Sequence, residues 1–300
     1  MLAFIHIPKC GGTTLIDVLR RNFGLAHLDL IAKDRSTMCY RANELNRIPG
    51  GFTHLKSIAG HAIRPASIFE DLVPETKYYT LLRDPVDRFI SDFRHFGKQQ
   101  YGMQDLCDWL RAGDRRFDRF NVQTKYLAGC DDVLVAKQIL EERVALVGLV
   151  ERYDEFLDGL RAISAPFSLD TRYVVQNAAK QRDPSTDALA KSKCCGEYLD
   201  EIKEKNSADI ELYEYVRDIL LPRQLARLAD DLAFSQSCEL SKLTSKLRRW
   251  QNYLFRNFVY KPSLGYWPWP LPINPTRRLA IEADCNENLD SKAVLPAGLA

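Results

Sequence analysis

The segment Phe4–Leu15 constrains the fold more than any other part of the sequence. It reads FIHIPKCGGTTL, an apolar run followed by a lysine, a glycine pair and two threonines. The apolar run predicts a strand that ends near Ile7, and the threonines predict a helix that begins near Thr13. The glycine pair lets backbone N–H groups approach an anion without obstruction by a Cβ atom, and the positive end of the helix points at the same place. The segment therefore predicts an α/β fold with a phosphate-binding loop after its first strand.

The lysine of this loop, Lys9, stands before the glycines. In nucleoside triphosphatase loops the lysine follows the glycines, and a Ser or Thr after it holds magnesium. The inverted order favours a phosphate-bearing ligand that is bound without an obligatory metal. Taken by itself, the segment also fits a plain strand-to-helix turn in which Thr13 caps the helix.

A second strand-to-helix turn is predicted in residues 77–95. Residues 78–82 predict a buried strand, and Pro85 suits the first position of a helix. Arg83 at the end of the strand and Ser91 about two turns into the helix can both reach one phosphate group. On its own the segment fits a surface Arg–Asp ion pair with a solvent-facing serine better.

Both segments resemble motifs of the sulfotransferases that use 3′-phosphoadenosine 5′-phosphosulfate (PAPS), in particular the heparan sulfate 6-O-sulfotransferase branch. The string HIPKCGGTTL resembles the loop that binds the 5′-phosphosulfate, and RDPVDRFIS at residues 83–91 resembles the signature that binds the 3′-phosphate. The likeness extends over about residues 2–222. Two motifs in the same order, each on a strand-to-helix turn, are more specific than either one alone.

The resemblance implies a donor site and its chemistry. The residues it assigns to PAPS are Lys9, Cys10, Gly11, Gly12, Thr13, Thr14, Arg83 and Ser91. Lys9 is also expected to be catalytic, because its ammonium group can stabilise the charge that grows on the leaving nucleotide. No metal is expected to be required.

His61 is the candidate general base. It ends a strand predicted in residues 53–61, and the chemistry of open α/β sheets collects at the carboxyl ends of strands. A lone histidine at such a place is more often structural. The 6-O-sulfotransferase pattern, however, has a histidine at the matching place that serves as the base. We therefore expect His61 to accept the proton of the acceptor hydroxyl.

Four further residues are candidates for the acceptor side of the site: Arg88, His95, Asn121 and Gln123. All four match the family pattern. Arg88 and His95 lie seven residues apart in the helix predicted after Pro85, which places them on roughly one face. A helix-capping or ion-pair role fits Arg88 equally well, and residues 114–130 equally fit a solvated helix with its aromatic residues turned inward.

The remaining pattern completes one α/β domain, which we place at residues 1–235. Residues 26–31 and 144–149 predict two more strands, and residues 187–232 predict helices with a boundary near Asn206. The sum is a P-loop-like three-layer α/β domain with a central, mostly parallel sheet flanked by helices, followed by a helical C-terminal extension. A chain of 300 residues with 46% hydrophobic content can bury one substantial core of this kind.

Residues 236–281 form the extension and differ in composition. No Asp or Glu occurs from Leu240 through Ile281, whereas eight Lys and Arg residues and three of the four Trp do. The residues that recur at helical spacing, and predict a basic amphipathic helix, are Leu243, Leu247, Trp250, Leu254 and Phe258. The helix either docks on the catalytic domain with its cations in solvent, or contacts an anionic membrane or a polyanionic acceptor. Residues 282–300 are expected to be a disordered tail.

Charge, cysteine content and hydropathy set the remaining expectations. A net charge of +2 does not discriminate between partners, and the eight cysteines show no metal-ligand spacing, so we expect reduced thiols. The first strand is predicted to begin at Leu2, and no run of about 18 apolar residues occurs. We therefore expect a cytoplasmic location, with peripheral membrane attachment through residues 236–281 as an open alternative.

The sequence thus predicts a PAPS-dependent sulfotransferase that modifies a hydroxyl of a carbohydrate or glycoconjugate and has no nucleic-acid partner. A P-loop small-molecule kinase is the first alternative. It would need the order Gly-Lys-Ser/Thr and a carboxylate for magnesium at a strand end, where this chain has Arg83. A non-catalytic glycan- or membrane-binding module is the second alternative, and it leaves the two anion-binding motifs unexplained.

Overall fold

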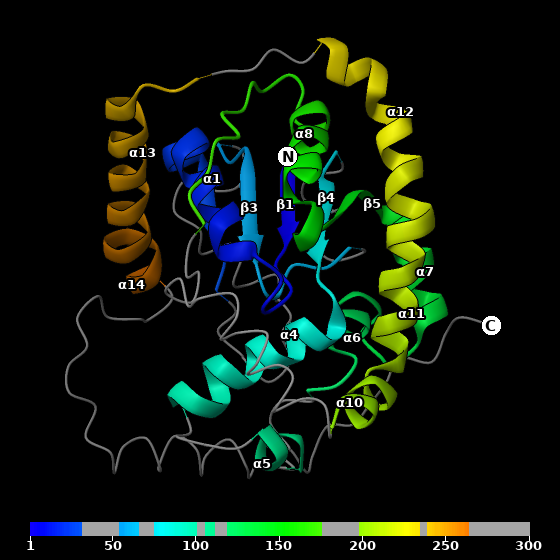
Figure 1. The fold of residues 1–300 in the computed structure, drawn as a ribbon. Helices are drawn as coiled ribbons and strands as arrows, with labels where there is room; N and C mark the ends of the chain where they lie inside the picture. The colour runs from blue at the N-terminus through cyan, green and yellow to red at the C-terminus, as the bar shows by residue number, and fades with distance from the viewer. Residues whose placement is uncertain are drawn as a thin grey trace, which may run out of the picture.

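The computed structural model of the chain describes residues 1–31, 54–65, 75–100, 106–111, 119–175, 198–234 and 239–263. Within these residues one sheet has five strands: Leu2–Ile5 (β1), His27–Asp29 (β2), Ser57–Gly60 (β3), Lys77–Leu82 (β4) and Val144–Leu149 (β5). The strand order is β2-β3-β1-β4-β5, and every neighbouring pair is parallel (Figure 1). The predicted parallel sheet is confirmed.

The strands form because their residues are apolar and can be covered on both faces. β1, the central strand, has the sequence LAFI and is completely buried. The bulky side chains of β4, including Tyr79 and Leu81, are buried as well. Together with β3 and β5 they form the centre of the core, and helix residues such as Leu15 and Phe156 pack against them.

The helices make up the rest of the domain. The α-helices are Gly12–Phe23 (α1), Pro85–Asp92 (α4), Leu106–Arg111 (α5), Val122–Ala128 (α6), Val133–Arg143 (α7), Tyr153–Ile163 (α8), Leu199–Lys205 (α10), Ser207–Tyr215 (α11), Leu221–Phe234 (α12), Lys242–Leu254 (α13) and Lys261–Ser263 (α14). Short 3₁₀ segments occupy Gly24–Ala26 (η1) and Val150–Arg152 (η3), and π-helical segments occupy Phe93–Gln100 (η2), Val216–Leu220 (η4) and Phe255–Tyr260 (η5).

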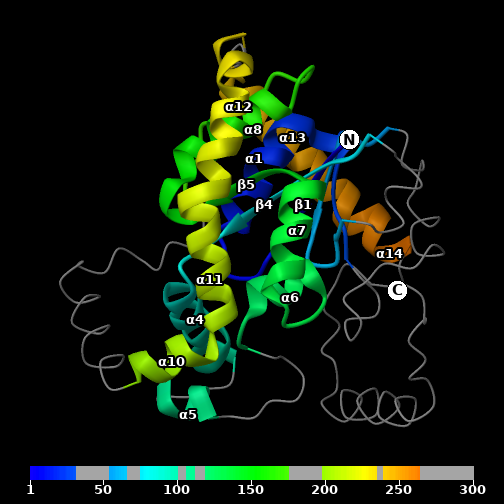
Figure 2. The same ribbon diagram turned by 90° about the vertical axis from the view of Figure 1, so that its right-hand side faces the viewer.

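The helices flank the sheet, as predicted. α1 and α8 lie in front of the sheet in Figure 1, and α11, η4 and α12 form one long column beside β5 (Figures 1 and 2). Parallel crossover connections are right-handed. Because α1 leads toward β2 and α7 leads toward β5, at opposite edges of the sheet, the two helices cover opposite faces. The result is a three-layer α/β domain.

A second, smaller core holds α4 in place below the sheet. Phe89 and Phe93 from α4 and η2 pack with Trp109 of α5 and Ile202 of α10. The start of α4 is fixed by its own sequence: Pro85 stands in its first turn, and the Asp84 carboxylate accepts a hydrogen bond of 2.9 Å from the Asp87 N–H. These contacts fix the direction of the helix that follows β4.

Two predicted helix boundaries are corrected in detail. Asn206 separates α10 from α11 as predicted, but its side chain donates back to the Ile202 carbonyl instead of capping α11. The helix predicted in residues 114–130 begins only at Val122 in the described part of the chain. The reason is Asn121, whose φ of 50° places it in the left-handed region and interrupts a right-handed helix.

Some expectations fall on residues that the structure does not describe. The tail at residues 282–300 lies outside the described ranges. Of the eight cysteines, Cys10 and Cys130 are described as free thiols. In the described ranges, no helix combines the length and the apolar character that crossing a bilayer requires. The cytoplasmic location stays a prediction.

Candidate active site

Three neighbouring strands deliver the candidate residues to one edge of the sheet. The loop with Lys9 follows β1, His61 follows β3, and Arg83 follows β4. β3, β1 and β4 are adjacent and parallel, so their carboxyl ends lie side by side (Figure 1). The connections after β1 and β4 lead toward opposite edges of the sheet, and ligands of open α/β sheets bind at such a point.

The loop after β1 has the backbone of an anion-binding turn. Lys9 and Gly11 have φ values of 68° and 69°, both in the left-handed region. Glycine adopts this conformation freely, whereas for Lys9 it is strained, and such strain collects at functional sites. Gly11 is also the residue before α1, so the alternative in which Thr13 caps the helix is wrong. No described side chain caps the start of α1, so its first N–H groups point at the loop.

The second glycine of the loop, Gly12, is needed because of its neighbour. It is buried, and a Cβ atom placed on it would lie 2.2 Å from Cδ2 of the His6 ring. That ring is itself fixed, because it stacks on His61 with the ring centroids 4.1 Å apart. The close approach of Gly12 and His6 therefore links the loop to the candidate base.

Replacing Gly12 with alanine is expected to lower the free energy of unfolding by about 1–3 kcal/mol, because the added methyl group has to displace the His6 ring. Urea unfolding measures the change. Thr13→Ala at the next, exposed position is the control and should stay within about 0.5 kcal/mol of the wild type. Equal stability of Gly12→Ala and the wild type would contradict the tight contact.

His61 is oriented as a proton acceptor. Its Nδ1–H donates to the His6 carbonyl oxygen at 2.6 Å, which leaves the Nε2 lone pair to accept a proton. Loss of water around the ring lowers the pKa of His61, and the hydrogen bond to His6 partly opposes this effect. The ring is nevertheless accessible from solvent, because the residue is exposed at the edge of the sheet. At pH 7 the imidazole of His61 is therefore neutral, and its role as the base stays a prediction.

His6 supports this arrangement without carrying charge. Burial, with a smaller contribution from the neighbouring His61, lowers its pKa to about 3. Its backbone N–H donates to the Gly60 carbonyl at 3.1 Å, which ties β1 to the end of β3. A neutral ring against His61 avoids a like charge that would disfavour protonation of the base.

Arg83 is held by the amide of Gln123. The Arg83 N–H donates to Gln123 Oε1 at 2.9 Å, and Gln123 Nε2 donates to the Arg83 carbonyl at 3.0 Å. The same Oε1 accepts from the Cys10 thiol at 3.5 Å. Gln123 is fully buried, and the Asp209 carboxylate in turn accepts from its backbone N–H. The amide thus connects the loop after β1 to the end of β4.

Asn121 serves the same framework. Its Oδ1 accepts from the Asp209 N–H and its Nδ2 donates to the Asp131 carboxylate, each at 3.1 Å. Both ends of this side chain, and both ends of Gln123, are therefore bound within the protein. The predicted contact of Asn121 and Gln123 with an acceptor stays a prediction.

Arg88 and His95 differ in exposure. Arg88 is 1% exposed, and its Nη2 donates to the Arg119 carbonyl at 2.8 Å, whereas His95 is exposed against Phe96. The helix changes from α-helical to π-helical geometry at Phe93, between the two residues. Both residues act on the carboxylate of Asp92 through their charge. Their contact with an acceptor stays a prediction.

Positive charge gathers where the strands end. The Arg83 side chain donates to the Lys9 carbonyl at 3.3 Å, and Arg88 Nη1 lies 4.0 Å from the Asp92 carboxylate. Burial lowers the pKa of Lys9, and the negative charge of Asp92 opposes that shift. Among the described residues, neither Arg83 Nε nor Arg88 Nε has a hydrogen-bond partner, although both atoms are buried. A bound ion or water is one explanation for a buried donor without a partner, but Nε of Arg21, Arg161 and Arg256 share the feature, so it is not specific to this edge of the sheet.

The comparison with known proteins agrees with this geometry. A family model described as the sulfotransferase family matches residues 1–216 of the chain. The chain belongs to the sulfotransferase family. It is similar to heparan-sulfate 6-O-sulfotransferase 2 of Danio rerio, with 26% identity over 325 residues that cover 88% of this chain and 67% of that protein. It is also similar to heparan-sulfate 6-O-sulfotransferase 1 of Gallus gallus, with 31% identity over 110 residues, 32% of this chain and 27% of that protein.

The family predicted from the two motifs is thereby confirmed. As a sulfotransferase-family enzyme, the chain carries its loop, His61 and Arg83 within the matched residues. Sequence reasoning missed the supporting residues of this site, namely His6, Asp92 and Asp209. His6 gave one usable signal, since it is a polar residue inside an apolar run. Asp92 and Asp209 gave no signal, because a carboxylate in a helix is ordinarily exposed and nothing in the sequence shows that these two are buried.

Proposed function

We propose that the chain transfers a sulfuryl group from PAPS to a hydroxyl of a carbohydrate or glycoconjugate. The observation that carries the proposal is that three features meet at one edge of the sheet: a helix start that no described side chain caps, two arginines, Arg83 and Arg88, and the imidazole of His61 with Nε2 free to accept a proton. The names of the two relatives support a carbohydrate acceptor. Heparan sulfate itself is the acceptor named for those relatives, and we include it among the candidates.

The donor half of the proposal needs two separate phosphate sites, and the residues fit both. Backbone N–H groups of Gly11, Gly12 and Thr13, with the hydroxyl groups of Thr13 and Thr14, would hold the 5′-phosphosulfate. Arg83 and the half-buried Ser91 would hold the 3′-phosphate. When bound, PAPS supplies a sulfuryl group on a nucleotide that can leave.

Lys9 and His61 would carry the chemistry. His61 Nε2 would take the proton of the acceptor hydroxyl. The hydroxyl oxygen would bond to the sulfur of PAPS as the bond between sulfur and the nucleotide oxygen breaks. The Lys9 ammonium group stabilises the negative charge that grows on that leaving oxygen. The remaining rate enhancement comes from positioning, since the protein holds both partners by fixed contacts.

On the acceptor side, the exposed His95 is the better placed of the two candidates in the helix after β4. Arg88 is buried among protein groups, so we assign it to the electrostatics of the donor site. Its charge also opposes the rise that burial causes in the pKa of Asp92. A kinase function is disfavoured by the cation at the end of β4 and by the lysine that precedes the glycines.

The proposal is tested in two steps. A thermal shift titration should show a stabilising response to 3′-phosphoadenosine 5′-phosphate that exceeds the response to ATP with magnesium. Incubation with sulfur-labelled PAPS and a panel of glycans that includes heparan sulfate should then label at least one glycan. A larger response to ATP with magnesium would favour the kinase, and nucleotide binding without labelling of any hydroxyl acceptor would argue against the transferase.

Replacing Arg83 with alanine is expected to weaken binding of 3′-phosphoadenosine 5′-phosphate by about 1.5–3 kcal/mol, because one charge-assisted contact is lost. The analogue without the 3′-phosphate should lose much less. Calorimetric titration of both nucleotides measures the difference, and Arg217→Ala at an exposed position is the matched control. Equal losses for the two nucleotides would remove Arg83 from the 3′-phosphate site.

A further inference from the structure

The helix α13 is fixed to the domain by its polar face. Asn252, which is 1% exposed, donates from Nδ2 to the Gly24 carbonyl at 3.0 Å and to the His27 carbonyl at 2.8 Å. Arg256 forms an ion pair of 3.2 Å with the buried Asp29. Further along, the buried Tyr260 hydroxyl accepts from the Ile31 N–H at 3.2 Å. These contacts reach from the end of α1 to the end of β2.

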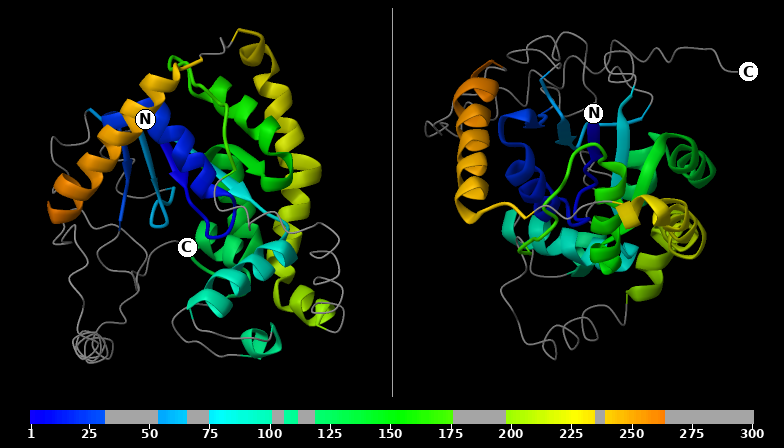
Figure 3. Two further views of the ribbon diagram at one scale, coloured as in Figure 1. Left: turned by 60° about the vertical axis from the view of Figure 1, so that its left-hand side comes forward. Right: turned by 90° about the horizontal axis from the view of Figure 1, so that it is seen from above.

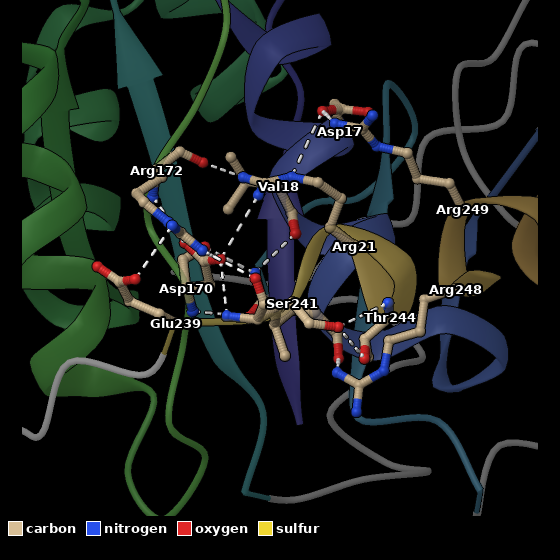
Figure 4. Close-up of polar contacts among 12 residues, drawn as sticks. Asp17, Val18, Arg21, Asp170, Arg172, Glu239, Ser241, Thr244, Arg248 and Arg249 are labelled. Carbon is tan, nitrogen blue, oxygen red and sulfur yellow. Dashed lines mark hydrogen bonds and ion pairs between the residues drawn. The ribbon is translucent and has the colours of Figure 1, made fainter. Parts of the chain in front are cut away.

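The start of α13 is held as firmly (Figure 4). Arg249 pairs with Asp17 of α1 at 2.6 Å, and Arg248 donates to the Asn22 carbonyl. Just before the helix, the Leu240 N–H donates to the buried Asp170 carboxylate at 3.0 Å. The Ser241 hydroxyl then accepts from the Thr244 N–H and caps the helix. The helix is therefore a fixed part of the surface along its whole length.

Six large apolar residues of α13 and η5 face solvent, whereas Phe255 and Tyr260 pack toward the core. Figures 1 and 3 show α13 at the outer edge of the molecule, beside α1. Exposed fractions range from 42% to 77% for the six residues that we call the apolar stripe: Leu243, Leu247, Trp250, Tyr253, Phe258 and Val259. The sequence predicts that a docked helix turns its cations to solvent, and the exposed Lys242, Lys246 and Arg249 agree with this expectation. Arg248 and Arg256 do not, because together with Asn252 they contact the domain.

A row of cations runs next to the apolar stripe. At about 100° per residue, Lys242, Lys246 and Arg249 lie along one line of the helix, beside the line of Leu243, Leu247 and Trp250. All three cations are exposed, and none of the described carboxylates pairs with Lys242 or Lys246. No Asp or Glu occurs between residues 240 and 281 to balance them. The outward surface of α13 thus combines an apolar half with a cationic half.

We infer that this surface binds an anionic lipid bilayer. An interfacial helix inserts Trp, Phe and Leu side chains at the boundary of headgroups and acyl chains, while Lys and Arg contact anionic headgroups. The apolar stripe supplies the first group and the adjacent row supplies the second. Long lysine side chains can reach the headgroups from the flank of the helix. Because α13 is already folded and anchored, insertion costs little ordering of the chain.

The charge of this surface argues against a second copy of the chain as the occupant. A symmetric contact through the apolar stripe would bring the cationic rows of two copies together without carboxylates between them. A purely polyanionic partner would leave the six apolar side chains exposed to water. An anionic bilayer satisfies both halves at once.

The test is flotation of the full chain with vesicles of phosphatidylcholine alone and of phosphatidylcholine mixed with phosphatidylserine. The main variant is L243Q/L247Q/W250Q, which changes exposed positions only. The matched control is L134Q on α7, where Leu134 is 70% exposed and lies outside the stripe. A charge variant, K242Q/K246Q, tests the cationic half. Thermal shift with 3′-phosphoadenosine 5′-phosphate confirms that each variant is folded.

We expect the wild type and L134Q to float with the mixed vesicles and to be released by salt. Binding of the stripe variant to the mixed vesicles should fall at least about tenfold. Binding of the charge variant to the mixed vesicles should fall about tenfold, whereas its binding to the neutral vesicles should change little. Equal flotation of the wild type and a folded stripe variant, or no flotation of the wild type, would overturn the inference. A dimer of the wild type that the stripe variant abolishes, without vesicle binding, would assign the surface to a second copy instead.

Discussion

Lys9→Ala is expected to lower turnover by about two to four orders of magnitude. The physical reason is the position of the ammonium group in a strained loop at the end of β1, beside a helix start that no described side chain caps. Without the ammonium group, only neutral donors and the arginines are left to stabilise the charge that grows on the leaving nucleotide. Initial rates with labelled PAPS and a saturating acceptor measure the effect.

The control for this variant separates chemistry from binding. Affinity for the product 3′-phosphoadenosine 5′-phosphate should fall far less than turnover, since the backbone N–H groups and Arg83 still hold the phosphates. Lys137→Ala, at an exposed ion pair on α7, should leave turnover unchanged. A Lys9→Ala enzyme whose turnover drops no more than its nucleotide affinity would show that the lysine only binds.

His61→Ala is expected to lower turnover by about two to four orders of magnitude while nucleotide binding stays largely intact. The residue lies at the surface, where its ring stacks on His6 and donates to the His6 carbonyl, so its loss should disturb the fold less than the loss of a core residue. Near-normal turnover of the variant with a saturating acceptor would show that the assigned base is wrong.

The pH profile provides a second readout for His61. The base must be neutral to accept a proton, so turnover falls as pH drops through its pKa. Burial lowers that pKa from its ordinary value of 6.5, which places the acidic limb of the wild-type profile below pH 6.5. His61→Ala should lose this limb. An acidic limb that persists unchanged in the variant would report another group.

The fold could be predicted from the sequence because its signals are local. Each strand is a short apolar run followed by a turn, and Pro85 and the glycines of the loop mark where helices begin. The orientation of α13 could not be predicted in this way. Helical spacing shows that a helix has two faces, but the partner of each face depends on groups distant in the sequence, such as the carbonyls of Gly24 and His27.

The candidate site also has a part that local sequence signals predict and a part that depends on residues distant in the sequence. Lys9, His61 and Arg83 were predicted together because each follows a strand, and parallel strands end at one edge of a sheet. Gln123 contacts Arg83 and Cys10, which lie 40 and 113 residues away in the sequence. The local sequence pattern does not predict contacts over such separations. The change from α-helical to π-helical geometry after Asp92 has no signal in the local sequence either.

His6 stands between the two halves of the reaction. Its ring lies against Gly12 in the loop and against His61, and its carbonyl oxygen accepts the His61 hydrogen bond. A ligand that displaced Gly12 would therefore press on the same ring that stacks on His61. Thermodynamic linkage would make any coupling between ligands at the two places reciprocal. His6 thus joins the loop to the candidate base by direct contact.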